Sequence, residues 1–75
     1  MITILSFYKL KKIKKLKNLK TILFEKIDIL SIKGLIILSP EGINGTISGT
    51  PKSISVARKY LLFVLNISKF DVQNI

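Results

Sequence analysis

The sequence contains neither cysteine nor histidine. The missing cysteines exclude a disulfide framework, a thiol nucleophile and a thiolate metal site, and the missing histidines remove the usual base near neutral pH and the imidazole metal ligand. Only four residues are acidic, and they are spread along the chain: Glu25, Asp28, Glu41 and Asp71. Folding would have to bring two of them together before acid–base chemistry became available. We therefore predict no catalytic residue, no metal site and no cofactor in this chain.

Long hydrophobic runs are absent as well. The longest extends from Tyr60 to Leu65, far short of the roughly 20 apolar residues that span a bilayer as a helix. Residues 1–8 have no basic region before their short apolar stretch and no small-residue cleavage site after it, so a secretory signal is not expected. These absences predict a cytoplasmic protein.

Lysine and apolar residues dominate what is present. Hydrophobic residues make up 48% of the 75 residues, which is enough for one small folded domain and too many for a disordered tail. Thirteen Lys or Arg against four Asp or Glu give a net charge of +9. Positive charge at this density attracts phosphate polymers and makes nucleic acid the natural partner class, although the same charge could be no more than a solvated surface.

The first part of the chain predicts a strand followed by a basic helix. Residues 2–9 are rich in β-branched and aromatic side chains, as in a central strand. From Lys12 to Asp28, apolar residues recur at spacings of three and four with lysines between them, which indicates an amphipathic helix. Its apolar positions are Ile13, Leu16, Leu19, Leu23 and Ile27.

A hairpin is predicted in the middle of the chain. Residues 32–39 form a buried strand that Pro40 should end, and residues 45–49 form the strand that follows. Between them, residues 40–44 contain the glycine and asparagine that accept the positive φ of a tight reversal. We therefore expect the chain to turn over residues 40–44.

A second helix is predicted from Thr50 to Asn66. Thr50 followed by Pro51 is typical of a helix start, because the hydroxyl caps free N–H groups and proline needs no donor in the first turn. The predicted core stripe consists of Ile54, Ala57, Leu61 and Val64, broadened by Val56, Tyr60 and Phe63. Residues 70–75 then begin a short fourth strand.

The resulting order, β-α-β-β-α-β, predicts an α+β fold of the ferredoxin-like type, with two helices on one face of a four-stranded antiparallel sheet. The other face of the sheet is open. No repeat or linker divides residues 1–75, so a single domain is expected. An alternative for the first helix is an interfacial membrane helix, but lifting it from the sheet would expose much of a small core.

Two stretches carry a resemblance to a known family: ILSFYK at residues 4–9 and KGLIILSPEGINGTISG at residues 33–49. With the order and spacing of the elements, they resemble the N-terminal acylphosphatase-like domain of the rhodanese-containing tRNA uridine hydroxylases. One small departure is Leu35, where the family often has threonine. The centre of the match is Glu41, Gly42, Ile43, Asn44 and Gly45.

The resemblance implies that an intact protein hydroxylates the wobble uridine of certain tRNAs to 5-hydroxyuridine in an oxygen-dependent reaction. Family members continue into a rhodanese domain with a reactive cysteine, and we expect residues 1–75 to lack that domain and to be inactive alone. The implied role is an accessory domain that binds the anticodon stem-loop of tRNA. The implied partners are tRNA and a rhodanese domain of the same or a separate chain, without membrane or metal.

Candidate RNA-binding residues lie at and after the end of the first strand: Tyr8, Lys9, Lys11, Lys12, Lys14, Lys15 and Lys17. Tyr8 could stack on an unpaired base of an anticodon loop, and the lysines could neutralise phosphates. The alternative is that Tyr8 is a core or edge aromatic and Lys9 a solvated strand end. For residues 41–45 the alternatives are a well-made turn, or a loop tip that offers Glu41 and the Asn44 amide to RNA or to the rhodanese domain.

Three other interpretations stay open. A free-standing acylphosphatase is disfavoured, because that chemistry needs a phosphate-cradling loop with an arginine after the first strand, and the only arginine is Arg58 in the second predicted helix. A stand-alone RNA-recognition module has the same element order, but residues 45–49 lack the aromatic side chains of its stacking motif. The chain could also be a non-functional remnant.

Overall fold

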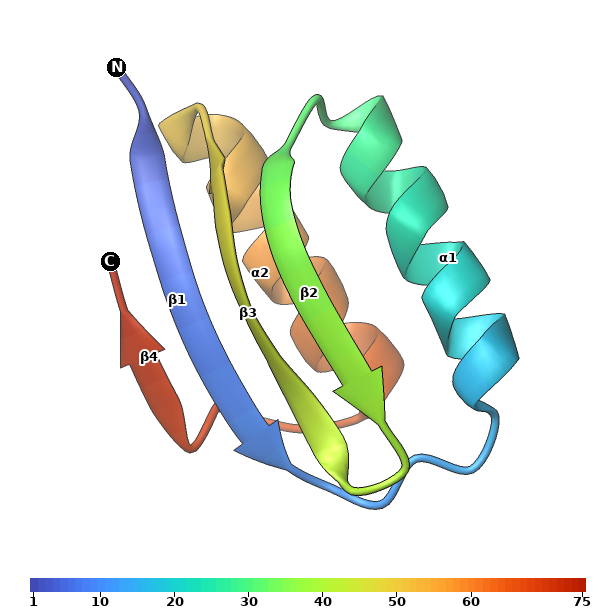
Figure 1. Ribbon diagram of the computed structural model, residues 1–75. Coiled ribbons are helices and arrows are strands. Elements are labelled where there is room, and N and C mark those ends of the chain that lie inside the picture. Colours follow the sequence, from blue (N-terminus) through green and yellow to red (C-terminus); the bar gives the residue numbers. More distant parts are fainter.

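The computed structural model describes residues 1–75 as one antiparallel sheet with two helices on one of its faces (Figure 1). The four strands lie in the order β2-β3-β1-β4. This arrangement confirms the predicted ferredoxin-like α+β fold with a short last strand. The elements in chain order are β1 (Thr3–Leu10), α1 (Leu16–Ile29), β2 (Lys33–Ser39), β3 (Gly42–Gly49), α2 (Pro51–Leu65) and β4 (Val72–Asn74).

The core lies between the sheet and the helices. Successive side chains of a strand point to opposite faces, so Leu5 and Phe7 of β1 are buried under the helices while Ile4 and Tyr8 are exposed on the other face. The Phe7 ring lies 5.0 Å from the Phe70 ring, centroid to centroid. The remaining buried side chains are Leu23, Ile32, Ile43, Ile47, Ile54, Ala57, Leu61 and Leu65.

Helix α2 has the boundaries that its local sequence predicts. The Thr50 hydroxyl accepts a hydrogen bond from the Ser53 N–H at 3.1 Å, and Pro51 occupies the first turn. At the other end, Asn66 adopts the left-handed conformation with φ of 55° and its N–H donates to the last turn. The α2 helix is therefore fixed at both ends by its own residues.

The predicted core stripe of α2 was too broad. Phe63 is 80% exposed and Val56 is also exposed, whereas Leu65, outside the predicted stripe, is buried. A helix turns about 100° per residue, so Phe63 lies about 180° around the axis from Ile54 and points away from the sheet. Phe63 is thus an aromatic side chain on the outer surface.

Helix α1 begins later than predicted, at Leu16 rather than at Lys12. The Lys11 N–H donates to the Glu41 carbonyl oxygen at 2.9 Å, and the Ile13 N–H donates to the Pro40 carbonyl oxygen at 3.0 Å. These bonds hold the backbone of residues 11–15 as a loop against the β2–β3 turn. The lysine-rich segment is therefore mainly a loop, which we call the β1–α1 loop.

The β2–β3 turn is tighter than predicted. Strand β3 already begins at Gly42, so the turn consists of Pro40 and Glu41, and the expected reversal over residues 40–44 is wrong. The expected positive φ at this turn is also wrong, because the glycine with positive φ is Gly34, at 132°. Gly42 instead allows the backbone of β1 to approach β3 closely, because a Cβ there would lie 2.3 Å from the Lys9 carbonyl oxygen.

Neither α1 nor α2 has the length and apolarity of a helix that crosses a membrane.

Candidate nucleic-acid interface

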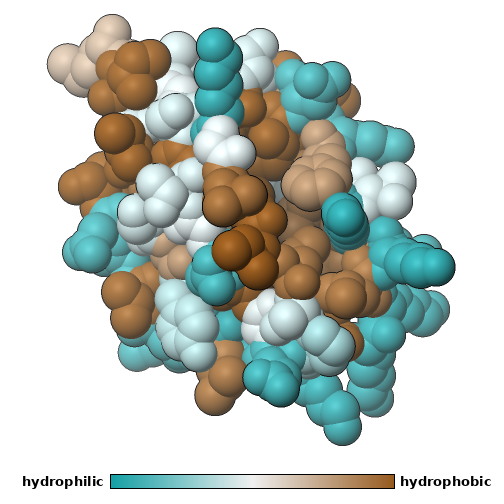
Figure 2. All heavy atoms as spheres, viewed as in Figure 1, coloured by the Kyte–Doolittle hydropathy of each residue, from teal (hydrophilic) through white to brown (hydrophobic).

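The open face of the sheet is largely apolar. Figure 2 shows brown side chains gathered over the strands and hydrophilic ones mainly on the side of α1 and along the lower rim. Asn44, Thr46 and Ser48 of β3 contribute polar groups among them. The exposed apolar side chains of this face are Ile4, Tyr8, Leu10, Leu35, Ile37 and Val72.

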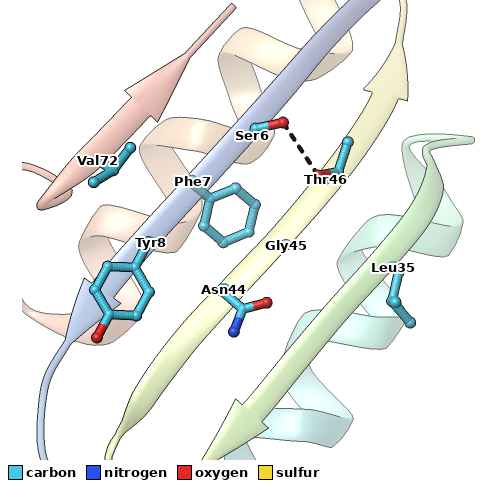
Figure 3. Close-up of a pocket in the computed structure, with 8 residues that line it drawn as sticks. All are labelled: Ser6, Phe7, Tyr8, Leu35, Asn44, Gly45, Thr46 and Val72. Atoms are coloured by element: carbon cyan, nitrogen blue, oxygen red, sulfur yellow. Dashed lines mark hydrogen bonds between the residues drawn. The ribbon is translucent and has the colours of Figure 1, made fainter.

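A shallow hollow of 310 Å³ lies around Tyr8 on this open face (Figure 3). Tyr8 is 41% exposed and is paired across the sheet with Asn44. The hydroxyls of Ser6 and Thr46 form a hydrogen bond of 3.1 Å at the other end of the hollow. No lysine lines it, so this surface offers an aromatic ring and an amide but no charge for a phosphate.

A second hollow, which we call the lysine groove, has a volume of 520 Å³ and lies between the β1–α1 loop, α1 and the end of α2. Four lysines and no acidic residue line it, so its electrostatic character suits an anionic partner. The groove also contains the exposed Phe63 and Ile22. Its lining residues are Lys11, Lys12, Ile13, Lys14, Lys15, Asn18, Leu19, Ile22, Phe63, Val64 and Leu65.

The structure separates the candidate RNA-binding residues into three groups. Tyr8 lies on the open face, and neighbouring strand residues point to opposite faces, so Lys9 does not share its surface. Lys9 is instead half-buried and forms an ion pair with Asp71, Nζ to Oδ1 at 3.1 Å. Lys17 is exposed on α1 outside the groove lining. The four that come together in the lysine groove are Lys11, Lys12, Lys14 and Lys15.

The Lys9–Asp71 contact fastens the end of β1 to the segment before β4. The Asp71 carboxylate accepts a hydrogen bond from the Leu10 N–H at 2.8 Å and another from the Lys9 ammonium at 3.1 Å. The Leu10 N–H first, and Lys9 second, lower the pKa of Asp71 below its ordinary value of 3.8, because both stabilise the charged form. Lys9 is therefore occupied within the chain.

The lowered pKa of Asp71 predicts a contribution to acid stability. A carboxyl whose pKa is lower in the folded chain contributes stability that is present above its ordinary pKa and is lost as the pH falls through the folded pKa. We expect the urea midpoint of the wild type to fall more steeply below about pH 4 than that of Asp71→Asn. Urea titrations at several acidic pH values measure this. Equal slopes for Asp71→Asn and the wild type would contradict the assignment.

The segment from Glu41 to Gly45 acts mainly through its backbone and its glycines. The carbonyl of Glu41 holds the β1–α1 loop, and Ile43 is buried in the core. A Cβ on Gly45 would lie 3.0 Å from Cζ of Phe7 and 2.7 Å from the Leu35 carbonyl oxygen, so the glycine makes room for both. Asn44 lies within β3 and not at a loop tip, which corrects the expected position of its amide. Only the side chains of Glu41 and Asn44 are exposed to a partner.

The remaining polar groups do not form a second site. Arg58 donates from Nε to Oε1 of Gln73 at 2.8 Å, which ties α2 to β4 rather than to the β1–α1 loop. No three acidic side chains come together in the way that a metal site requires.

Comparisons with known proteins give a consistent picture. The sequence matches the family described as the UPF0176 acylphosphatase like domain over residues 2–74. It is also similar to the tRNA uridine(34) hydroxylase of Pelagibacter ubique (strain HTCC1062), with 37% identity over 75 residues. That alignment covers 100% of this chain and 25% of the relative, so the chain spans a quarter of the relative's length.

Proposed function

Because this chain belongs to the family of UPF0176 acylphosphatase-like domains, we propose that it is the RNA-binding accessory domain of a protein that hydroxylates the wobble uridine of tRNA. The relative that matches the full chain is a tRNA uridine(34) hydroxylase, which makes tRNA the natural partner. The observation that carries the proposal is the lysine groove, in which four lysines and no acid face solvent on a domain of net charge +9.

Catalysis is assigned elsewhere in this proposal. The chain has no cysteine for the thiol chemistry of a rhodanese domain and no histidine to act as a base near neutral pH. A rhodanese-like domain of the same or a separate chain would carry out the oxidation. The role of this domain is then to bind the anticodon stem-loop, and the protein would act in the cytoplasm. The exposed side chains of Glu41 and Asn44 are available to contact the catalytic domain.

The lysines of the groove are suited to phosphate contacts. The Lys9–Asp71 pair is the only ion pair in the chain, so Lys12, Lys14 and Lys15 hold no acidic partner within it. Their loop is held by hydrogen bonds to the β2–β3 turn, which limits the entropy lost on binding. Each lysine that neutralises a phosphate releases a condensed counterion, and this release drives binding at low salt.

Binding to an isolated anticodon stem-loop tests the proposal. We expect the purified chain to bind a fluorescent stem-loop with a log association constant that falls linearly with log salt concentration, at a slope of about −3 for four lysine contacts. Fluorescence anisotropy over a range of salt concentrations measures this slope. An uncharged-backbone analogue of the same loop is the control and should bind weakly at every salt concentration. Absence of binding at about 50 mM salt, or a slope near zero, would refute the proposal.

A further inference from the structure

Phe63 is the most exposed aromatic side chain of the molecule, and it lines the lysine groove. An exposed apolar residue by itself needs no explanation. Here, however, the ring at the end of α2 lines the same groove as the lysines of the β1–α1 loop, with Ile22 also in the lining. Proteins bind single-stranded nucleic acid with an aromatic ring and cationic side chains in one groove, because each nucleotide has both a base to stack and a phosphate to neutralise.

We propose that the lysine groove binds a single-stranded segment of RNA, with Phe63 stacking on an unpaired base while the four groove lysines neutralise the adjoining phosphates. The inference rests on the proposed function and deepens it, since it names the base-contacting residue. Both walls are held in place: the loop by the carbonyls of Pro40 and Glu41, and the end of α2 by the Asn66 cap. The Asn18 amide in the same lining can donate to or accept from a base edge.

The open face of the sheet is the weaker site for a base. Its ring, Tyr8, is half as exposed as Phe63, at 41% against 80%. No lysine lines the hollow around Tyr8, so the hollow itself offers no cation to the phosphates of a base stacked there. Phe24 is exposed too, but it lies outside the groove lining, and the Lys20 ammonium already lies over its ring, 5.6 Å from the centroid. Phe63 is the more exposed ring, and it is the one that lines the lysine groove.

A single tryptophan makes the stacking directly visible. The chain has no tryptophan, so Phe63→Trp introduces one fluorophore at the proposed stacking position. We expect its fluorescence to be quenched when a single-stranded RNA of about ten nucleotides is added, because base stacking brings the rings into contact. Phe24→Trp and Tyr8→Trp are the matched controls and should change little. Quenching at Tyr8→Trp without quenching at Phe63→Trp would overturn the inference.

Affinity gives the second readout. We expect Phe63→Ala to weaken binding of the same RNA by roughly ten-fold or more, with the salt slope unchanged because no charge is lost. Binding of a fully paired RNA duplex should be unaffected by this substitution. Phe63 is exposed, so the thermal unfolding midpoint of Phe63→Ala should match the wild type.

The outcomes separate this inference from the proposed function. If the wild type binds RNA with the expected salt slope but Phe63→Ala binds equally well, only the stacking assignment is overturned. If the wild type binds neither the stem-loop nor single-stranded RNA, the proposed function and the inference both fail. If phosphatidylserine vesicles bind the wild type more tightly than RNA and Phe63→Ala loses that binding, the groove is a lipid site and the inference is overturned.

Discussion

Replacing Gly42 by alanine is expected to destabilise the domain by about 3 kcal/mol, the upper range for forcing extra volume into a packed position. The added Cβ would lie 2.3 Å from the carbonyl oxygen of Lys9 and 3.2 Å from Cα of Leu10. Both atoms belong to the backbone of the paired strand β1, so no side-chain rotation relieves the contact and β1 and β3 must separate. A chain of this length has a total stability of roughly 4 to 11 kcal/mol, so the loss is a large fraction of it.

Gly49→Ala is the matched control for this substitution. A Cβ at Gly49 would meet side-chain atoms only, the nearest being Cγ1 of Ile32 at 3.2 Å, and these can move. We expect Gly49→Ala to unfold in urea near the wild-type midpoint, and Gly42→Ala to unfold well below it. Equal midpoints for the two variants would show that β1 and β3 accommodate a methyl group and that the close approach is not what requires glycine.

Gly42→Ala should also loosen the lysine groove. Gly42 follows Glu41, whose carbonyl holds Lys11, and the neighbouring Pro40 carbonyl holds Ile13. Shifting the start of β3 therefore frees the backbone of the β1–α1 loop. In those Gly42→Ala molecules that remain folded, hydrogen exchange should speed up, relative to the wild type, more at the amides of Lys11 and Ile13 than at those in the middle of β1.

The elements that the sequence predicted correctly are those whose determinants are local. Helix α2 is capped by Thr50 and Asn66, which lie at its own ends, and both boundaries were predicted. Helix α1 has no side-chain cap at Lys15, and its start depends on hydrogen bonds from the β1–α1 loop to the β2–β3 turn. That turn is about 30 residues away, and Ile13 continues the helical spacing although it lies in the loop.

The hairpin was predicted in place but for the wrong reason. Gly42 and Gly45 next to Asn44 indicate a turn, because glycine and asparagine are typical of positive φ. In the structure these residues lie in β3 and pair with β1. Gly42 leaves room for the β1 backbone, and Gly45 leaves room for the Phe7 ring. A sequence does not show which strand will approach a glycine, so the two uses of glycine look alike before the sheet is known.

Of the residues that line the lysine groove, the sequence singles out the four lysines as candidates but not Phe63. Phe63 was assigned to the core, yet its angular position, about 180° from Ile54, was available from the helical period. The grouping of Tyr8 with Lys9 ignored the two-residue period of a strand, which puts them on opposite faces. That Lys9 pairs with Asp71 could not be foreseen, because the two are 62 positions apart in the chain.

Removing three charges from the lysine groove should weaken RNA binding by roughly 100-fold at about 0.1 M salt, because each lost phosphate contact removes one counterion-release term. The variant is Lys12→Gln, Lys14→Gln and Lys15→Gln combined. All three side chains are exposed and have no ion-pair partner in the chain, so the fold should be retained. Its salt slope should be shallower than that of the wild type by about 2. Anisotropy titrations against the anticodon stem-loop measure both quantities.

A variant with the same loss of charge elsewhere decides whether the groove or the net charge is responsible. Lys33→Gln, Lys52→Gln and Lys69→Gln combined also lower the net charge of +9 by three, at exposed positions outside the groove. None of these three side chains lines the groove, so they make no direct contact with RNA bound there, and this control should bind within roughly three-fold of the wild type and keep its slope. If both variants lose affinity equally, binding is a property of the whole basic surface. The groove would then have no special part in it, because only direct phosphate contacts make the position of a lysine matter.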